Sequence, residues 1–369
     1  MNTEQIYELV NDVAEQSLGD KAIAAVDTQG LISLGDAVLS SATYTEGFLN
    51  TLAMRIGKTI ISQRMYRNKL GDMVIDDFEY GAILQKISMH LVDAQADPSA
   101  DLVDGGSVDP WKIYKPDVEQ KLFVTRTPYM FPITIQRKWL KEAFLSESAM
   151  GAFLAMVFSR IRDSIEFSLE NLGRVCLANF AAETSNVIPL VTMYNAEAGK
   201  SLTAATCKHD PEFMAYAVAM LNHYSDMLTD MSTQWNDGSI ERHTPKEDQR
   251  FKIISDFNRR LETVVQYAAF HERFVTPEGE GYYNPINFWQ NEQSPYQIKI
   301  DRASDGSSVT IDNVIAMIYD RDALGMYKKT EEVLTSPINV YGSYYNQAYH
   351  EQQLWFNDLS ENFILFTLN

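Results

Sequence analysis

Cysteine is almost absent from this chain, and so are the signals of export. Cys176 and Cys207 are the only cysteines among 369 residues, too few to carry a fold that depends on disulfides. The first residues lack a basic stretch followed by an apolar one, and no apolar run approaches the length of a membrane span. We therefore expect a soluble protein made inside a cell, with reduced thiols and no membrane contact.

Bases are scarce relative to acids. The chain has 31 Lys and Arg against 50 Asp and Glu, which gives a formal net charge of −19. A protein that grips nucleic acid must present clustered Lys and Arg to the phosphates. The composition therefore argues against a specific nucleic-acid site. Hydrophobic residues make up 45% of the chain and charged residues 22%, which is typical of a folded protein with a substantial core and two or three subdomains.

The familiar motifs of enzyme chemistry are missing as well. No glycine-rich phosphate loop occurs, and no two of the six histidines have the i, i+4 spacing that chelates zinc on a helix. Cys207 lies two residues before His209, a spacing at which a nucleophile and its base rarely meet productively. We expect no catalytic residue, no cofactor and no metal site. A soluble enzyme whose site is invisible in a single sequence stays open as an alternative.

What the chain does contain is one long helical run, from Ser146 to about Phe180. An uninterrupted helix of that length spans about 50 Å. Ser146 and Glu147 supply a cap and a first-turn acid, and no proline interrupts the run. We interpret it as a backbone strut; an ordinary core helix of a large α-rich domain is the alternative. Its apolar stripe, in steps of mostly three or four, is Met150, Phe153, Leu154, Val157, Ile161, Ile165, Leu169, Leu172, Val175 and Phe180.

Before that helix, two segments rich in β-branched and aromatic residues, 76–91 and 111–135, predict a pair of long antiparallel arms. The chain between them, from Asp93 to Pro110, is turn-prone and contains acids but no base. A hairpin with acidic residues at its end and basic residues at its base would suit contact with a neighbouring copy of the same chain. A solvated loop with scattered charges is the alternative. The predicted inter-subunit residues are Asp97, Asp101, Asp104, Asp109, Lys112, Lys115, Lys121 and Arg126.

The rest of the chain predicts a mixture of helices and strands. An amphipathic helix at 3–17 has the character of an arm that needs a partner surface. The final segment, 338–368, predicts two paired strands that return to the long helix. Further elements are helices at about 33–41 and 45–61, short strands and turns at 186–206, a helix at 210–235, a strand passing into a helix at 252–270 and a strand at 313–319.

Four segments in this order resemble the major capsid proteins of small podophages related to phi29. They are LAMRIGK at 52–58, KWLKEAF at 138–144, AMIYDRD at 316–322 followed by Tyr327, and the tyrosine-rich run at 341–349. Their order and spacing carry the resemblance. The order of elements is likewise similar to the HK97-type capsid fold of tailed bacteriophages.

The resemblance implies an α+β, HK97-like fold with five parts. They would be an N-terminal arm with lead-in helices (1–62), an extended E-loop hairpin (63–136), a P-domain with the spine helix (137–185), an A-domain (186–322) and C-terminal P-domain strands (323–369). We expect no immunoglobulin-like domain of the kind that some relatives append, and we predict no cross-linking because no Lys, Asn and Glu set for it can be placed.

As function, the resemblance implies a major capsid protein that self-assembles into hexamers and pentamers of an icosahedral phage head. The head would be assembled in the host cytoplasm around a scaffolding protein, meet a portal at one vertex, and enclose double-stranded DNA in the virion. An encapsulin-like shell protein of a cellular compartment, enclosing cargo in place of a genome, is the alternative on the same fold.

Overall fold

The computed structural model describes residues 3–19, 24–55, 66–74, 84–92, 94–97, 103–109, 111–123, 126–238, 240–267 and 283–369. The chain forms two compact units. The first consists of Met1–Asp77, Arg126–Leu172 and Met326–Leu354, and the second of Phe78–Thr125, Gly173–Gly325 and Trp355–Asn369.

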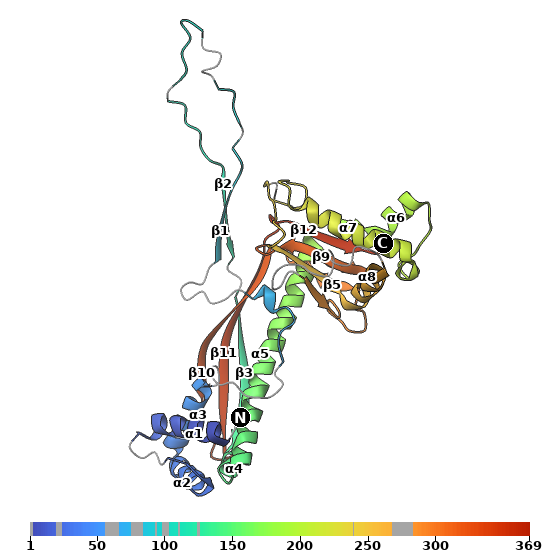
Figure 1. The fold of residues 1–369 in the computed structure, drawn as a ribbon. Helices are drawn as coiled ribbons and strands as arrows, with labels where there is room; N and C mark the ends of the chain where they lie inside the picture. The colour runs from blue at the N-terminus through green and yellow to red at the C-terminus, as the bar shows by residue number, and fades with distance from the viewer. Residues whose placement is uncertain are drawn as a thin grey trace. The chain divides into compact units, whose positions relative to one another are not determined.

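The long helix is present. Helix α5 (Glu147–Glu183) has 37 residues, beginning in the first unit and ending in the second (Figure 1). The Ser146 hydroxyl accepts a hydrogen bond from the Ala149 amide at 3.2 Å, as expected of an N-cap. Most of the predicted apolar stripe is buried, although Val175 is 43% exposed. The prediction of a long, capped amphipathic helix is therefore confirmed.

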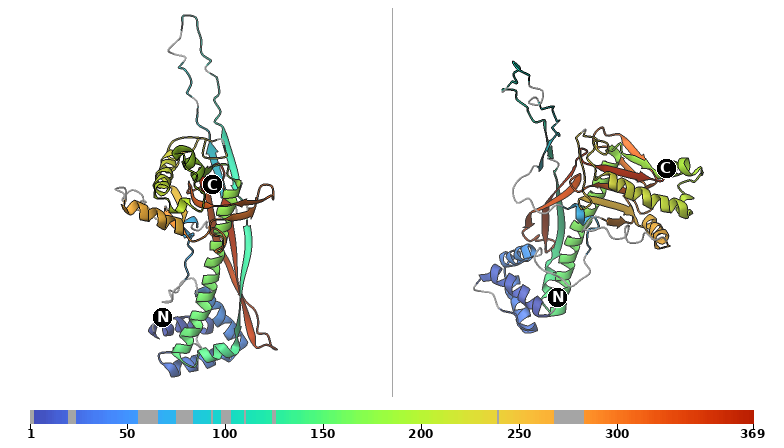
Figure 2. Two further views of the ribbon diagram at one scale, coloured as in Figure 1. Left: turned by 90° about the vertical axis from the view of Figure 1, so that its right-hand side faces the viewer. Right: turned by 45° about the horizontal axis from the view of Figure 1, so that its top comes forward.

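A three-stranded sheet runs beside α5 in the first unit, in the order β10 (Leu324–Thr335), β11 (Tyr344–Asn357) and β3 (Arg126–Gln136) (Figures 1 and 2). β3 pairs antiparallel with β11 along its whole length. The predicted returning arm at 111–135 is therefore divided between β2 (Val118–Phe123) and β3, and the residues of the first arm that would lie opposite 124–132 are outside the described part of the chain. Tyr345 and Tyr349 of β11 lie opposite Ile135 and Phe131 of β3, and this row of side chains packs in the core of the first unit.

Helices α1 (Thr3–Leu18), α2 (Thr28–Leu39), α3 (Ala42–Arg55) and α4 (Arg137–Ala143) complete the first unit. The apolar face of α1, including Val10 and Val13, is fully buried in the same core as Phe48 of α3. The expectation that this N-terminal helix needs a partner surface is therefore wrong. Its own chain covers the face, because α2 and α3 fold back over it.

The second unit is built on a five-stranded mixed sheet. Its order is β4 (Val187–Pro189), β12 (Phe363–Thr367), β9 (Val314–Asp320), β5 (Gln249–Ile254) and β6 (Tyr283–Ile286). β9 and β12 are buried at every residue, as continuous apolar strands covered on both faces should be. The unit also contains helices α6 (Leu190–Ala198), α7 (Pro211–Met227) and α8 (Ser255–Tyr267), and a hairpin of β7 (Ile298–Asp301) and β8 (Ser308–Ile311).

Two further expectations are corrected by the second unit. The segment expected to form only short strands and turns contains α6, a helix of nine residues that ends at Gly199 with a φ of 66°. The two C-terminal strands do not pair with each other: β11 pairs with β3, whereas β12 pairs with β4 and β9. The strand-to-helix prediction at 252–270 is confirmed for 252–267 by β5 and α8, and residues 268–270 lie outside the described part of the chain.

Candidate assembly surfaces

Strands β1 (Leu84–Met89) and β2 (Val118–Phe123) pair antiparallel and form what we call the hairpin ribbon (Figure 1). Side chains on such a ribbon alternate between its two faces. On the outer face, Ile87 lies opposite Gln120 and Met89 lies opposite Val118. Ile87 is 64% exposed and Leu122, on the same face, is 56% exposed. An apolar face that water contacts in this way is typical of an interaction site.

Apolar exposure continues along the described chain beyond the ribbon. Trp111 is 85% exposed and Tyr341, in the turn between β10 and β11 of the first unit, is fully exposed. Large side chains of this kind lie on the outside of a protein at a cost in hydration unless a partner covers them. The other exposed apolar residues between the two ribbon strands are Leu91, Val92, Val103, Val108, Ile113 and Tyr114.

The inner face of the ribbon is attached to the second unit. Phe123 packs on Phe356, with ring centroids 5.2 Å apart, and Ser88 is hydrogen-bonded to the Arg242 guanidinium. Lys86 and Lys121, also on this face, reach the loop that joins β11 to β12. One face of the ribbon is therefore held by its own chain while the other is not covered by any residue that the structure describes.

Five charged residues, Lys86, Lys121, Arg242, Asp358 and Glu361, make up what we call the anchor cluster. The Lys86 Nζ atom lies 2.8 Å from Asp358 Oδ2 and 2.7 Å from Glu361 Oε1. Lys121 Nζ lies 3.1 Å from Asp358 Oδ1, and Arg242 Nη2 lies 3.2 Å from Glu361 Oε1. The Asp358 side chain has no exposed surface, so water screens its pairing weakly. Two basic side chains of the hairpin are thus fixed on two acids of one loop.

Burial and pairing act in opposite directions on these groups. Burial alone would raise the pKa of Asp358, but the Lys86 charge and hydrogen bonds from Lys86 and Ser360 outweigh it and lower that pKa to about 2. Burial lowers the pKa of Lys86, yet Asp358 and Glu361 raise it more, so the net change is upward. For Glu361 the effect of burial is larger than the opposing effect of Lys86 and Arg242, so the pKa of this carboxyl group is raised. Asp358 is therefore the acid on which the attachment of the ribbon mainly depends.

The predicted inter-subunit residues fall in several environments. Asp97, Asp104, Asp109, Lys112 and Lys115 are exposed. Asp101 and the side chain of Arg126 lie outside the described part of the chain, although the Arg126 backbone pairs with Leu354 at the start of β3. Lys121 belongs to the anchor cluster and bonds within its own subunit. Sequence reasoning missed Asp358, Glu361 and Arg242, because nothing local in the sequence connects them with Lys86.

A row of acids on α5 holds the segment 66–69, which precedes the hairpin in the chain. The Asp163 carboxylate accepts a hydrogen bond from the Tyr66 amide at 3.1 Å, and Glu170 accepts one from the Lys69 amide at 3.2 Å. The Tyr66 hydroxyl also donates to Glu170, and the Tyr66 ring packs on Phe167. Because carboxylates here bind main-chain N–H groups, the segment is fixed without a regular secondary structure.

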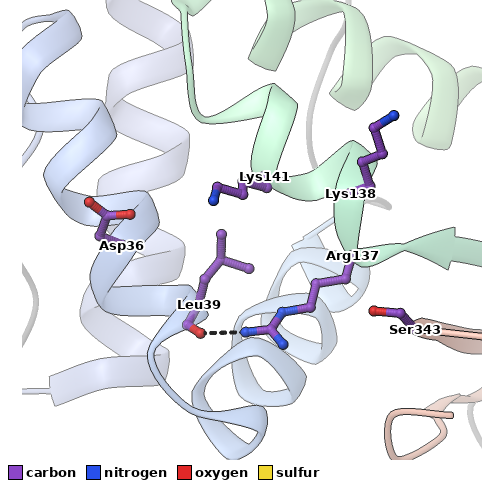
Figure 3. Close-up of a pocket in the computed structure, with 6 residues that line it drawn as sticks. All are labelled: Asp36, Leu39, Arg137, Lys138, Lys141 and Ser343. Carbon is purple, nitrogen blue, oxygen red and sulfur yellow. Dashed lines mark hydrogen bonds between the residues drawn. The ribbon is translucent and has the colours of Figure 1, made fainter. Parts of the chain in front are cut away.

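A recess of about 440 Å³ in the first unit is lined by Asp36, Leu39, Arg137, Lys138, Lys141 and Ser343, and we call it the basic recess (Figure 3). Three of its side chains are cationic and one is acidic. The Arg137 guanidinium donates a hydrogen bond to the Leu39 carbonyl oxygen at 3.0 Å. The Lys138 Nζ atom lies 3.8 Å from Glu142 Oε1, and the side chains of Lys138 and Glu142 are both exposed. Within the described ranges, Arg137 and Lys141 form no ion pair.

Among the residues that the structure describes, no three His, Cys, Asp or Glu side chains come together as a possible metal site. The described helices also include none that is long and apolar enough to span a bilayer. Cys176 and Cys207 are both buried, and burial raises the pKa of each thiol, that of Cys207 to about 11.

Comparison with solved structures identifies the fold. The chain matches a capsid structure of Staphylococcus phage Andhra with a TM-score of 0.56 and 12% identity, over 85% of this chain and 87% of that chain. It matches a chain in the structure of head fiber and inner core protein gp22 of native bacteriophage P68 with a TM-score of 0.53 and 12% identity, at the same coverage. The protein has the fold of phage capsid proteins of the HK97 type, as its sequence led us to expect.

Sequence comparison gives the family. The major capsid protein of Streptococcus phage Cp-1 is 25% identical over 227 residues, which are 60% of this chain and 59% of that relative. The chain thus spans about three fifths of the curated relative it matches. The model of the family described as "Phi29-like phage major capsid protein" matches residues 8–367. This chain belongs to that family.

Proposed function

We propose that this protein is the subunit that self-assembles, as hexamers and pentamers, into the icosahedral head of a tailed phage. The observation that carries the proposal is the hairpin ribbon, in a chain of the capsid family. Its inner face is fixed on the anchor cluster while its outer face presents Ile87 and Leu122 to water. Burial of such side chains against a neighbouring copy would release the hydration cost and supply a driving force for assembly.

The proposal extends to the binding partners of the protein and to the compartment in which heads are assembled. The protein acts by binding copies of itself and not by catalysis, and it meets a scaffolding protein and a portal when heads are built in the host cytoplasm. It encloses double-stranded DNA without a specific site for it, which its net charge of −19 supports because like charges repel. The five-part division at residues 62, 136, 185 and 322 is retained as part of this proposal.

Within the proposal, the exposed hairpin charges contact neighbouring subunits. They are Asp97, Asp104, Asp109, Lys112 and Lys115. Asp101 and Arg126, whose side chains lie outside the described part of the chain, are retained in the proposal on the strength of the sequence. Lys121 would contribute less, since its ammonium group already pairs with Asp358. Each such contact between exposed charges is worth about 0.2–1 kcal/mol. A closed shell multiplies many modest contacts, and weak contacts let misplaced subunits leave.

The test is assembly. The chain is expressed with the scaffolding gene of its own genome, and particles are examined by sedimentation and negative-stain microscopy. Icosahedral shells are expected from the wild-type chain. A variant with Ile87→Ser and Leu122→Ser should stay folded but yield several-fold fewer shells, because the outer face of the ribbon loses its apolar area.

The matched control changes two polar residues of the same outer face, Gln85→Ser and Gln120→Ser. It should assemble as the wild type does. A wild-type chain that remains monomeric with its scaffold would contradict the function. Equal shell yields from the apolar and polar variants would instead remove the ribbon from the argument.

The encapsulin-like alternative is not favoured, because the family and the matched structures are those of phage capsids. It predicts a different content. Shells purified from the native source would hold a cargo enzyme under this alternative, whereas the proposed function predicts double-stranded DNA, which nuclease treatment before and after opening of the shell detects.

A further inference from the structure

Strand β3 lies at one end of the three-stranded sheet of the first unit, so one of its edges has no strand partner among the residues that the structure describes (Figure 1). Continuing the register of Gln136 with Tyr344 places Arg137 opposite Ser343, and the Arg137 amide donates to the Ser343 carbonyl oxygen at 3.0 Å. The main-chain groups of successive residues in a strand point alternately to its two edges. The odd-numbered residues of β3 therefore direct their N–H and C=O groups to β11, and the even-numbered residues direct theirs to the free edge.

Two of the outward positions on this free edge are prolines, Pro128 and Pro132. Proline has no N–H, so the edge keeps its carbonyl acceptors there and loses two donors. Both proline rings are exposed, and Met130 between them, which retains its N–H, is 55% exposed. A strand that added here would bury two of its own carbonyl groups without a donor, which is costly.

The five-stranded sheet of the second unit has a proline in the strand at each end. At one end, the Leu365 amide of β12 donates to the Asn186 carbonyl oxygen at 2.9 Å, so Asn186 faces β12. Pro189 of β4, three residues further on, has the opposite parity and faces away from β12.

At the other end, Pro285 of β6 also faces outward. The Arg321 amide donates to the Asp248 carbonyl oxygen at 2.8 Å on the β9 side of β5, so the odd-numbered residues of β5 face β6. In a parallel pair, a residue that faces its neighbour bonds to the residues that flank the one opposite it. Ile253 lies opposite Pro285, which is therefore directed to the outer edge.

The prolines of these two sheets are confined to edge strands. β5, β9, β11 and β12, which have a partner on both sides, contain none. The fourth edge strand, β10, also lacks proline, and Val74 forms a parallel bridge with its Met326. The edge with prolines is longest at β3, which has eleven residues, whereas β4 has three and β6 four. A strand as long as β3 with an open edge is a template for pairing with another chain.

We propose that Pro128 and Pro132 close the free edge of β3 to a strand from a second copy of this chain. Without them, the edge would pair most simply with the same edge of another copy, because two copies of β3 related by a two-fold axis run antiparallel. With the edge closed, copies associate through side chains and not through main-chain pairing. The inference goes beyond the proposed function, since it assigns two residues to preventing a competing mode of self-association.

Restoring the two donors tests the proposal. A variant with Pro128→Thr and Pro132→Thr, expressed without a scaffold, should form aggregates that bind thioflavin T, and its soluble fraction should fall about fivefold or more relative to the wild type. The matched control, Pro116→Thr with Pro337→Thr, replaces two exposed prolines that lie outside the strands and should stay as soluble as the wild type. Circular dichroism and the unfolding midpoint of the soluble fraction verify that each variant folds.

A further pair of variants separates the closed edge from an effect on folding. Adding Met130→Pro to the two threonine changes removes the outward donor between them and should recover at least half of the lost solubility. Adding Tyr129→Pro instead removes a donor that faces β11, where Tyr129 lies opposite Glu351, and should recover none.

Two outcomes would overturn the inference. One is a double threonine variant that is as soluble as the wild type. The other is equal solubility of the Met130→Pro and Tyr129→Pro combinations, which would mean that the prolines act through the unfolded chain and not through the edge. These measurements use unassembled subunits, so a failure here leaves the capsid function standing, and a wild-type chain that forms no shells leaves this result unchanged.

Discussion

The ammonium group of Lys86 lies 2.8 Å from a carboxylate oxygen of Asp358, a residue with no exposed side-chain surface. This ion pair joins the first strand of the hairpin ribbon to the loop before β12. It is reinforced by Glu361, 2.7 Å from the same ammonium group. The direction in which the hairpin leaves the second unit therefore depends on side-chain charges as well as on backbone pairing.

Replacing Lys86 by Met should loosen the ribbon without unfolding the protein. The change leaves the buried Asp358 carboxylate with one cation fewer, at a cost of about 1–3 kcal/mol. Amide hydrogen exchange in β1 and β2, followed by mass spectrometry, should quicken. Lys112→Met, a change at an exposed lysine of the same hairpin, is the control and should leave exchange in the ribbon unaltered.

The stability that Asp358 contributes should disappear in acid. Its folded pKa of about 2 is lower than the ordinary value of 3.8, so its contribution is present above pH 3.8 and is lost as the pH falls through about 2. The difference in the free energy of unfolding between wild type and Asp358→Asn, from denaturant titrations, should shrink by about 2 kcal/mol over that range.

Glu361→Gln supplies a comparison of opposite sign. Burial raises the pKa of Glu361, so the folded protein gains stability as the pH falls through that raised pKa. The stability of the wild type relative to this variant should therefore rise in acid. Parallel pH profiles for the two variants would show that the cluster does not titrate as its geometry predicts.

Truncation of a leucine on α5 and of one just before this helix should separate buried from exposed leucines. Leu154→Ala removes a fully buried side chain from the first unit and should cost about 2–5 kcal/mol. Leu145→Ala, at a residue 55% exposed, should change the free energy of unfolding by about 0.5 kcal/mol or less. Thermal and denaturant unfolding of the two variants would measure the contrast.

Two helical glycines should respond to alanine in opposite ways. A Cβ on Gly35 of α2 would lie 2.5 Å from the Phe144 Cβ, so Gly35→Ala should destabilise by about 1–3 kcal/mol. A Cβ on Gly47 of α3 would have Ser17 as its nearest neighbour at 3.7 Å, an ordinary contact. Gly47→Ala should gain about 1 kcal/mol from helix propensity. A stabilised Gly35→Ala variant would mean that α2 packs less closely on Phe144.

The elements predicted well from the sequence are those set by local pattern. The apolar stripe of α5 and the Ser146 cap each depend on residues that are only three or four positions apart in the sequence. Both are confirmed. The strand and helix predicted at 252–270 are confirmed over the described residues 252–267 for the same reason. The long helix and the order of segments were sufficient for the resemblance to the capsid fold.

The parts that could not be predicted depend on contacts between distant segments. β3 has the composition of a hairpin arm, yet its partner is β11, more than half the chain away. The amphipathic face of α1 shows that something covers it, but the sequence does not say whether that is α3 or another subunit. The anchor cluster joins Lys86 to Asp358 in the same way, and no spacing rule connects two such residues.

The ribbon's uncovered apolar face has a practical consequence for a chain with a net charge of −19. Two identical subunits repel each other electrostatically at low ionic strength, and added salt shortens the range of this repulsion. The hydrophobic attraction between their apolar faces does not weaken when salt is added. Raising the ionic strength therefore favours association of the subunits. A purification that begins at low salt should keep the subunits separate.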